Sequence, residues 1–348
     1  MTSATPAGAT SPDTSSPSES STPPVISTRG LVKRFSDIDA VAGIDLAVPP
    51  GGVYGFLGPN GAGKTTTIRI LLGLIRPTRG SAALFGEPVA AGRAVLDRVG
   101  ALVERPAFYP YLSATDNLRL LGLARGIEES RLGTLVPEAL DRVGLSEAAR
   151  RKAGRFSTGM RQRLGIAAAL LGRPDLVILD EPANGLDPNG VVDVRRLISA
   201  LAGDGITVFL SSHVLPEVEQ LCQRVAILQK GRIVAEGETQ AMLRQGERLY
   251  VRFDSADEAT RARPVLEAFG AADTTGGDKA LLVDLAAARG SEVSRRLAEA
   301  GLYPAELSVR RQTLENVFIE LTGEHDPAVP PIGIVAADPA TAIDGTGP

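Results

Sequence analysis

The chain has 348 residues, a formal net charge of −4 and a pI near 5.5. This charge balance argues against a general nucleic-acid-binding protein, which usually carries a basic face, so we expect no nucleic-acid partner. The single cysteine, Cys222, excludes an internal disulfide framework and indicates a buried thiol in a reducing compartment. No apolar run approaches the ~18–20 residues that a membrane span requires, so we expect no direct membrane span.

The two ends of the chain differ in composition from its middle. Residues 1–24 are mostly Ser, Thr, Pro, Ala and Gly and contain no Lys or Arg, which predicts a disordered tail without the charged region of a secretory signal. Residues 324–348 are similarly rich in Pro, Ala and Gly and predict a second disordered tail. Residues 25–243 alternate strand-like and helix-like patterns, which is typical of an α/β domain with a largely parallel sheet.

The run from Gly58 to Thr65 reads Gly-Pro-Asn-Gly-Ala-Gly-Lys-Thr, which is a P-loop. A glycine-rich turn brings backbone N–H groups close to phosphates, Lys64 adds a cation, and the Thr65 hydroxyl is a magnesium ligand. A buried strand is predicted at Gly52–Leu57, and a helix over Thr66–Leu74 directs its N-terminus at the phosphates. The predicted phosphate-binding residues are Gly58, Pro59, Asn60, Gly61, Ala62, Gly63, Lys64, Thr65 and Thr66.

Further along, four apolar residues at Leu176–Leu179 predict a central strand that ends in Asp180 and Glu181. Ligands of open α/β sheets bind at the carboxyl ends of the strands. Asp180 is therefore predicted to hold magnesium, and Glu181 to polarise an attacking water. An ordinary strand followed by a polar turn is the alternative for this run by itself, but the P-loop upstream favours the nucleotide interpretation.

Residues 248–322 predict a small α+β accessory domain of ferredoxin-like type, after a linker near Arg244–Glu247. The expected elements are strands at Leu249–Phe253, Ala280–Leu285 and Glu306–Arg310 and helices at Asp257–Phe269, Glu292–Ala300 and Thr313–Leu321. The last helix carries an apolar stripe that must pack against its own small sheet or against a partner, and its own sheet is the simpler expectation. This stripe consists of Leu314, Val317, Phe318 and Leu321.

The stretch Phe156-Ser157-Thr158-Gly159-Met160, which opens a predicted helix through Leu164–Leu170, resembles the signature loop of ABC transporter ATPases. The resemblance covers residues 27–240 and implies a P-loop NTPase of ABC type with a helical subdomain, followed by the small α+β domain. The remaining motifs follow in the family's order: Phe35 at the position of the adenine-stacking aromatic, Glu104 at the Q-loop, Gly185-Leu186-Asp187 like the D-loop, and His213 like the switch histidine.

The resemblance implies an ATPase that uses ATP and Mg²⁺ and works as a homodimer. In such a sandwich, Ser157 and Gly159 of one subunit meet the γ-phosphate held by Lys64 of the other. Glu181 is the implied general base, His213 contacts the γ-phosphate, and Asp187 reaches across the interface. Closing and reopening would drive a separate multi-span membrane permease, which implies a cytoplasmic location, peripheral on the inner face of the membrane.

Two positions depart from the family's usual pattern. The commonest signature is Leu-Ser-Gly-Gly-Gln, whereas this chain has Phe, Thr and Met at three of the five places. Glu104 replaces the Q-loop glutamine and is expected to join Thr65 and Asp180 as a metal ligand, with an effect on turnover or coupling. Both departures resemble the multidrug and antibiotic exporter ATPases of the daunorubicin- and bacitracin-resistance type, which implies export of a drug, antibiotic or lipid-like compound.

Two other classes of ABC ATPase compete with the exporter. Those that act on ribosomes usually have two P-loops in one chain, and those of DNA repair carry a long coiled-coil insertion before the signature loop. This chain has one P-loop and about ninety residues between the two motifs, without a heptad run. The exporter interpretation is therefore favoured, and residues 248–322 are expected to support pairing or permease attachment rather than nucleotide binding.

Overall fold

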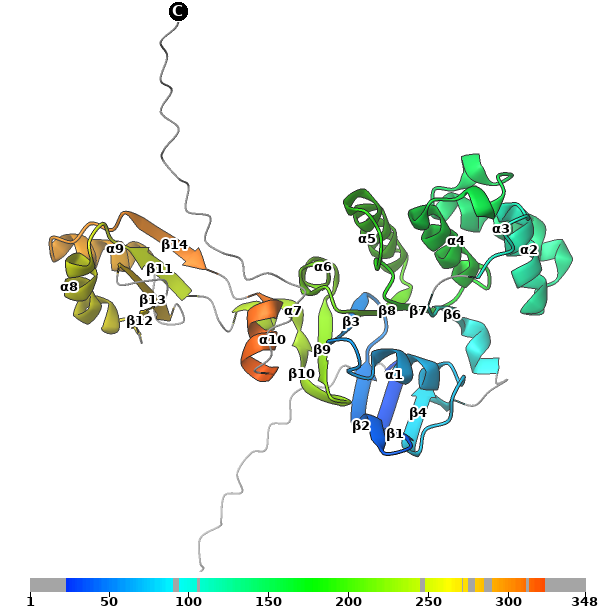
Figure 1. The fold of residues 1–348 in the computed structure, drawn as a ribbon, viewed down its shortest axis with the longest axis horizontal. Coiled ribbons are helices and arrows are strands. Elements are labelled where there is room, and N and C mark those ends of the chain that lie inside the picture. Colours follow the sequence, from blue (N-terminus) through cyan, green and yellow to red (C-terminus); the bar gives the residue numbers. More distant parts are fainter. Residues whose placement is uncertain are drawn as a thin grey trace, which may run out of the picture.

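The computed structural model describes residues 23–89, 94–104, 107–244, 248–270, 272–274, 279–284, 290–310 and 313–322. The two predicted tails therefore lie almost wholly outside the described residues, as do three of the four residues of the predicted linker. Within the described residues the strands form three sheets (Figure 1).

The central sheet has six strands, and all neighbouring pairs except β9 with β10 are parallel. Side chains of its inner strands alternate between two cores, and both sets are apolar, so each strand reads as a continuous hydrophobic run. In sheet order the strands are β10 (Arg232–Glu238), β9 (Arg224–Gln229), β3 (Val53–Leu57), β8 (Thr207–Ser212), β7 (Leu176–Asp180) and β6 (Val99–Leu102).

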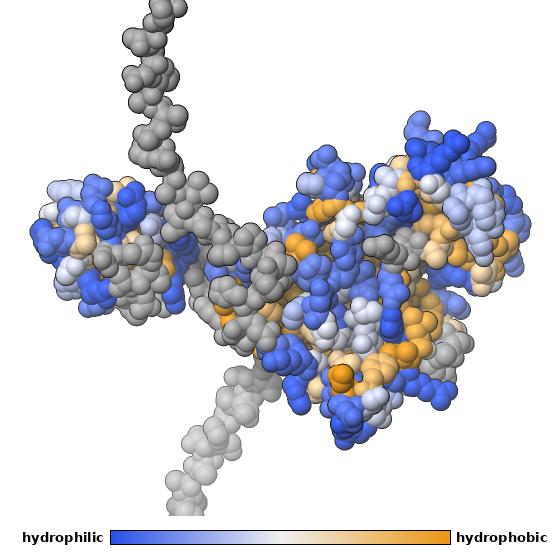
Figure 2. Space-filling view, in the orientation of Figure 1, coloured by the Kyte–Doolittle hydropathy of each residue, from blue (hydrophilic) through white to orange (hydrophobic). Residues whose placement is uncertain are grey.

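An antiparallel sheet covers one face of the central sheet, with α1 (Lys64–Leu71) between them. The helix begins directly after Gly63, two residues earlier than expected, because the left-handed Gly63 turns the chain into it. The strand order of this sheet is β2 (Ile38–Val48), β1 (Ile26–Phe35), β4 (Arg79–Leu84) and β5 (Glu87–Pro88). Figure 2 shows hydrophobic surface over the region where β1, β2, β4 and α1 lie.

Helices cover the opposite face of the central sheet and share one hydrophobic core. The helices of this face are α2 (Ala114–Ala124), α3 (Glu129–Arg142), α4 (Thr158–Leu170), α5 (Pro188–Gly203), α6 (Leu215–Leu221) and α7 (Thr239–Arg244). Helices α2, α3 and α4 project from the sheet as the helical part of the unit (Figure 1), and α4 begins within the predicted signature loop.

The third sheet is antiparallel and has the strand order β12 (Ala272–Thr274), β13 (Ala280–Asp284), β11 (Arg248–Arg252), β14 (Glu306–Arg310). Helices α8 (Ala256–Glu267) and α9 (Gly290–Glu299) pack on it through a separate core. The chain order βαββαβ and this strand order are those of a ferredoxin-like fold. The short strand β12 has no apolar alternation and was not expected from the sequence.

The last helix, α10 (Leu314–Thr322), packs against α6 and α7 and not on the small sheet (Figure 1). Leu314 and Phe318 are buried in the core shared with the central sheet, and the Leu314 N–H donates to Glu219 Oε2 at 3.2 Å. The expectation that the stripe covers its own sheet is therefore wrong. The small sheet already has α8 and α9 on that face, so α10 has no place there.

Candidate functional site

The P-loop connects β3 to α1 and is held close to two neighbouring strands. A Cβ at Gly63, where φ is 104°, would lie 2.3 Å from the carbonyl oxygen of Ala40 in β2. A Cβ at Gly58 would lie 2.5 Å from the carbonyl oxygen of Leu228 in β9. Real Cβ atoms do not approach other atoms so closely, so glycine is required for this loop to pack where it does.

Lys64 is buried, and its ammonium group is fully engaged inside the loop. Its Nζ donates to the carbonyl oxygens of Gly58 at 2.7 Å and Pro59 at 3.3 Å. The same Nζ lies 3.2 Å from Glu181 Oε1. Since an ammonium has three donors, these contacts satisfy it, and they place its charge beside the concave side of the loop.

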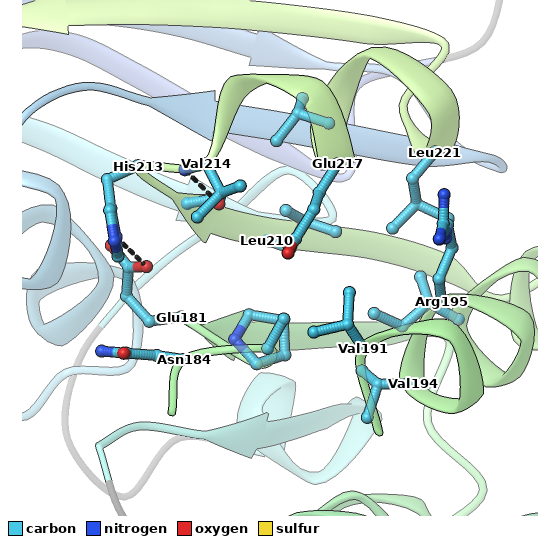
Figure 3. Close-up of a pocket in the computed structure, with 15 residues that line it drawn as sticks. Glu181, Asn184, Val191, Val194, Arg195, Leu210, His213, Val214, Glu217 and Leu221 are labelled. Atoms are coloured by element: carbon cyan, nitrogen blue, oxygen red, sulfur yellow. Dashed lines mark hydrogen bonds and ion pairs between the residues drawn. The ribbon is translucent and has the colours of Figure 1, made fainter. Parts of the chain in front are cut away.

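Glu181 lies between two groups from different parts of the chain. One carboxylate oxygen contacts Lys64, and the other, Oε2, lies 2.7 Å from Nδ1 of His213 (Figure 3). Its backbone has φ 50°, a left-handed conformation that costs a non-glycine residue on the order of 1 kcal/mol. The end of β7, the P-loop and the turn after β8 thus meet at this one carboxylate.

Asp180 ends β7 and is buried. Its Oδ1 accepts a hydrogen bond of 2.5 Å from the Ser211 hydroxyl, which leaves Oδ2 without another hydrogen bond among the described residues. Helix α1, with Thr65 in its first turn, packs against β7. One carboxylate and one hydroxyl suit Mg²⁺, which is usually held by few protein oxygens together with phosphates and waters. The residues present therefore fit a nucleotide-bound magnesium ion.

Glu104 is not part of this group. Its side chain is exposed and forms an ion pair with Arg69 of α1. Within the described part of the chain, no cluster of three or more His, Cys, Asp or Glu side chains could hold a metal. In this structure Arg69, one turn after Thr65, pairs with Glu104, so the role of Glu104 as a metal ligand stays a prediction.

The predicted signature loop lies at the start of α4. Ser157 is the N-cap of this helix, and its hydroxyl accepts from the Met160 N–H at 3.2 Å. No atom lies within 4 Å of where a Cβ of Gly159 would be, so the backbone there is open. Asp187 likewise caps α5 through the Gly190 N–H at 3.1 Å. None of these side chains is hydrogen-bonded to the P-loop among the described residues.

Phe35, the predicted adenine-stacking residue, ends β1 and is 49% exposed. The ammonium of Lys33 lies 4.9 Å from the centre of its ring. An exposed aromatic face beside a cation can stack on a base, and as a single observation it equally fits a surface aromatic.

Glu181 and His213 also form one end of a small pocket between α5 and α6, with a cavity volume of about 30 Å³ (Figure 3). The walls are mainly aliphatic, and Glu217 of α6 lies along them. Burial raises the pKa of the Glu217 carboxyl, and the nearby Arg195 and His213 counteract part of this shift. Beyond α6, Cys222 is buried as expected, and burial raises the pKa of its thiol.

Ser211 was not predicted from the sequence as a site residue, although it lies at the centre of the hydrogen bonds that hold Asp180 and Glu181. Its hydroxyl donates to Asp180, and it accepts from the Glu181 N–H at 3.0 Å. The signal was present, since a polar residue follows the apolar run of β8 at the ligand-binding end of the sheet. Only the strand order shows that β8 is the neighbour of β7.

Residues 41–184 match the family model described as ABC transporter. The bacitracin transport ATP-binding protein BcrA of Bacillus licheniformis is 38% identical over 302 residues, covering 86% of this chain and 97% of that protein. The daunorubicin/doxorubicin resistance ATP-binding protein DrrA of Streptomyces peucetius is 37% identical over 305 residues, covering 86% and 92%.

Solved structures give the same result for the fold. The structure of cbiO1 from Clostridium perfringens, part of the ABC transporter complex cbiONQ, matches with a TM-score of 0.59 and 25% identity, covering 63% of this chain and 90% of that chain. An ATP-binding subunit of an ABC transporter matches with a TM-score of 0.57 and 30% identity, covering 64% and 92%. The resemblance and the fold class inferred from the ordered motifs are confirmed. Because the likeness runs through most of this chain and nearly all of these relatives, the chain belongs to the ATP-binding subunits of ABC transporters, which are ATPases.

Proposed function

We propose that this chain hydrolyses ATP as a homodimer, with Glu181 as the general base, and energises a separate membrane permease. The observation that carries the proposal is the position of the Glu181 carboxylate, between the P-loop lysine and His213. A base for water attack must lie beside the phosphate-binding loop and be oriented by a second group. Glu181 meets both conditions.

Nucleotide binding would replace the internal contacts of Lys64. The phosphates bind the N–H groups of the P-loop and of the first turn of α1, and Lys64 turns its ammonium from Glu181 to the phosphates. Thr65 and Asp180 would hold Mg²⁺, which would supply charge neutralisation at the bound phosphates.

Hydrolysis then needs a base and an oriented water. Glu181, released from Lys64, accepts a proton from the water. At the same time the water oxygen bonds to the γ-phosphorus, and the bond from this phosphorus to the leaving ADP oxygen breaks. His213 holds the second oxygen of Glu181 and so fixes the direction of the first. Positioning and charge neutralisation supply most of the catalysis in phosphoryl transfer.

The second copy completes the site. Ser157 and Gly159 lie at the exposed start of α4, where a hydroxyl and open backbone N–H groups can receive a phosphate from another subunit. The chain has one P-loop, so a pair of identical subunits related by twofold symmetry supplies two complete sites. Asp187, at the exposed start of α5, is the residue proposed to reach the partner.

The relatives named for bacitracin transport and for daunorubicin resistance support export of an antibiotic-like compound as the purpose of hydrolysis. No helix among the described residues is both long and apolar enough to cross a bilayer. A permease encoded separately would then provide the membrane path, and this chain would act at the inner face of the membrane.

The variant Glu181→Gln tests the proposal. It keeps the shape of the side chain and removes the base, so we expect ATP binding to persist and hydrolysis to fall below detection. An ATP-bound dimer should accumulate, which light scattering measures. Glu217→Gln is the matched control, since it changes another carboxylate of the same pocket. Among the described residues, the Glu217 carboxylate contacts neither Lys64 nor the P-loop. Parent-rate hydrolysis by Glu181→Gln would refute the assignment of the base.

A further inference from the structure

The hydroxyl of Ser211 joins the two residues on which the proposed chemistry depends. Ser211 is completely buried at the end of β8. Its Oγ donates to Asp180 Oδ1 at 2.5 Å and accepts from the Glu181 N–H at 3.0 Å. The Ser211 hydroxyl thus acts as a donor to one residue and as an acceptor from the next, both at the end of the neighbouring strand β7.

The sheet register explains why this residue occupies this position. Strands β7 and β8 are parallel neighbours, with Asp180 opposite Ser211 and Ile178 opposite Phe209. Since side chains alternate along a strand, Asp180 and Ser211 follow Ile178 and Phe209 on the same face of the sheet. The surroundings before them are apolar, so a hydroxyl there must find its partners within the protein.

The hydrogen bond to Glu181 acts on a strained part of the chain. Glu181 has φ 50°, which L-residues with long side chains rarely adopt. Its N–H is held by Ser211, and its C=O accepts from the Asn184 N–H at 3.1 Å. Both peptide groups that flank this conformation are therefore fixed, and the first of them depends on a single side chain.

We propose that Ser211 is a positioning residue for ATP hydrolysis. By occupying Oδ1 of Asp180, its hydroxyl leaves Oδ2 for the nucleotide's magnesium, and by holding the Glu181 N–H it keeps that carboxylate between Lys64 and His213. The inference rests on the proposed roles of Asp180 and Glu181. Partners that orient a metal ligand typically change metal affinity or activity by about 10–100-fold when they are removed.

Two variants of almost equal shape isolate the hydroxyl. Ser211→Thr keeps it and Ser211→Val replaces it with a methyl group, so any effect of added volume is common to both. We expect Ser211→Val to need about 10-fold more Mg²⁺ for half-maximal hydrolysis and to lose about 10-fold in kcat, while Ser211→Thr stays near the parent. Ser211→Ala removes the hydroxyl without adding atoms and carries the same expectation if the larger side chains prevent folding.

Nucleotide binding gives a readout that does not depend on turnover. By calorimetry, Ser211→Val and Ser211→Ala should bind ADP like the parent when EDTA removes the metal. The gain in ADP affinity on adding Mg²⁺ should be smaller than in the parent. A merely structural defect would weaken both measurements together, and that result would overturn the proposal.

Ser212→Ala is the matched control. Ser212 is the next residue, is also buried, and its Oγ accepts from the Val214 N–H at 2.9 Å instead of contacting a carboxylate. Its Mg²⁺ requirement should equal that of the parent. Equal Mg²⁺ requirements and kcat values for Ser211→Thr and Ser211→Val would refute the role of Ser211. If Asp180→Asn and Glu181→Gln instead retained turnover, the proposed function itself would fail.

Discussion

The central sheet and the small C-terminal sheet use opposite solutions to the same packing problem. The central strands are parallel and buried on both faces, and their carboxyl ends bring Asp180, Glu181 and Ser211 to one edge. The small sheet is antiparallel and packs one face against α8 and α9. A parallel sheet collects loops from distant parts of the sequence at one edge, whereas an antiparallel sheet distributes its turns between two edges.

The helix α10 shows that the two regions are nevertheless connected. The chain leaves the small sheet after β14 and returns to the larger unit, where α10 packs beside α6. Helix α6 follows His213 after one residue, so the C-terminal segment packs against the element next to the turn that carries His213. Residues 248–322 are proposed to act in regulation or pairing. The contact between α10 and α6 is a physical route for that role.

The largest expected effect is the difference in stability and ATP binding between two glycine substitutions, one in each region. Gly63→Ala should destabilise the P-loop by about 4 kcal/mol and abolish ATP binding, because a Cβ at φ 104° would clash with the Ala40 carbonyl. Gly301→Ala in the small unit, at φ 69° with open space around it, should cost about 1 kcal/mol and leave binding unchanged. Thermal unfolding and nucleotide titration measure both; equal losses would contradict the steric argument.

Lys64→Ala should follow in magnitude. Removing the ammonium eliminates charge-assisted hydrogen bonds to the phosphates, which are worth about 1.5–3 kcal/mol each, so ATP affinity should fall about 100-fold or more. Calorimetric titration of the folded variant checks this expectation. The variant Glu181→Gln should keep its affinity, since the role proposed for Glu181 is to act on the water and not on the bound phosphates. Near-parent affinity of Lys64→Ala would show that Lys64 does not reach the nucleotide.

The connection between the regions can be broken at α10. Phe318→Ala should lower the free energy of unfolding of the unit that binds ATP by about 3 kcal/mol, because the ring is buried in the core of the central sheet. Val309→Ala, at an exposed side chain of β14, should change this free energy by less than about 0.5 kcal/mol. Chemical denaturation with and without ADP separates the two units. If Phe318→Ala destabilised only the small unit, the assigned packing of α10 would be incorrect.

The smallest effect is expected at Glu104. Its exposed ion pair with Arg69 is worth at most about 1 kcal/mol, so Glu104→Gln should leave stability and ATP binding almost unchanged. A magnesium titration of hydrolysis then decides its role. A changed Mg²⁺ requirement would show that Glu104 approaches the metal once nucleotide is bound, and an unchanged one would leave it as a surface residue of the loop.

Most of the nucleotide site was predictable because its residues are adjacent in sequence. Gly58 to Thr65 form one turn, and Asp180 and Glu181 end one strand, so local spacing fixes their geometry. The ion pair of Glu104 was not predicted, since its partner Arg69 is 35 residues away and no local pattern indicates that pair. The packing of α10 was missed for the same reason, because an amphipathic stripe shows that a face is buried but not what covers it.

The sequence by itself therefore determined the family, the order of the strands along the chain, and the loop and strand ends that we propose carry the chemistry. Tertiary structure decided which strands are neighbours, and with that the contacts of Ser211 with Asp180 and Glu181 and of Glu181 with Lys64 and His213. The physical reason is the separation along the chain over which each interaction acts. Turn chemistry and strand alternation act over a few residues, whereas strand order follows from the burial of both faces of the sheet, which involves the whole unit at once.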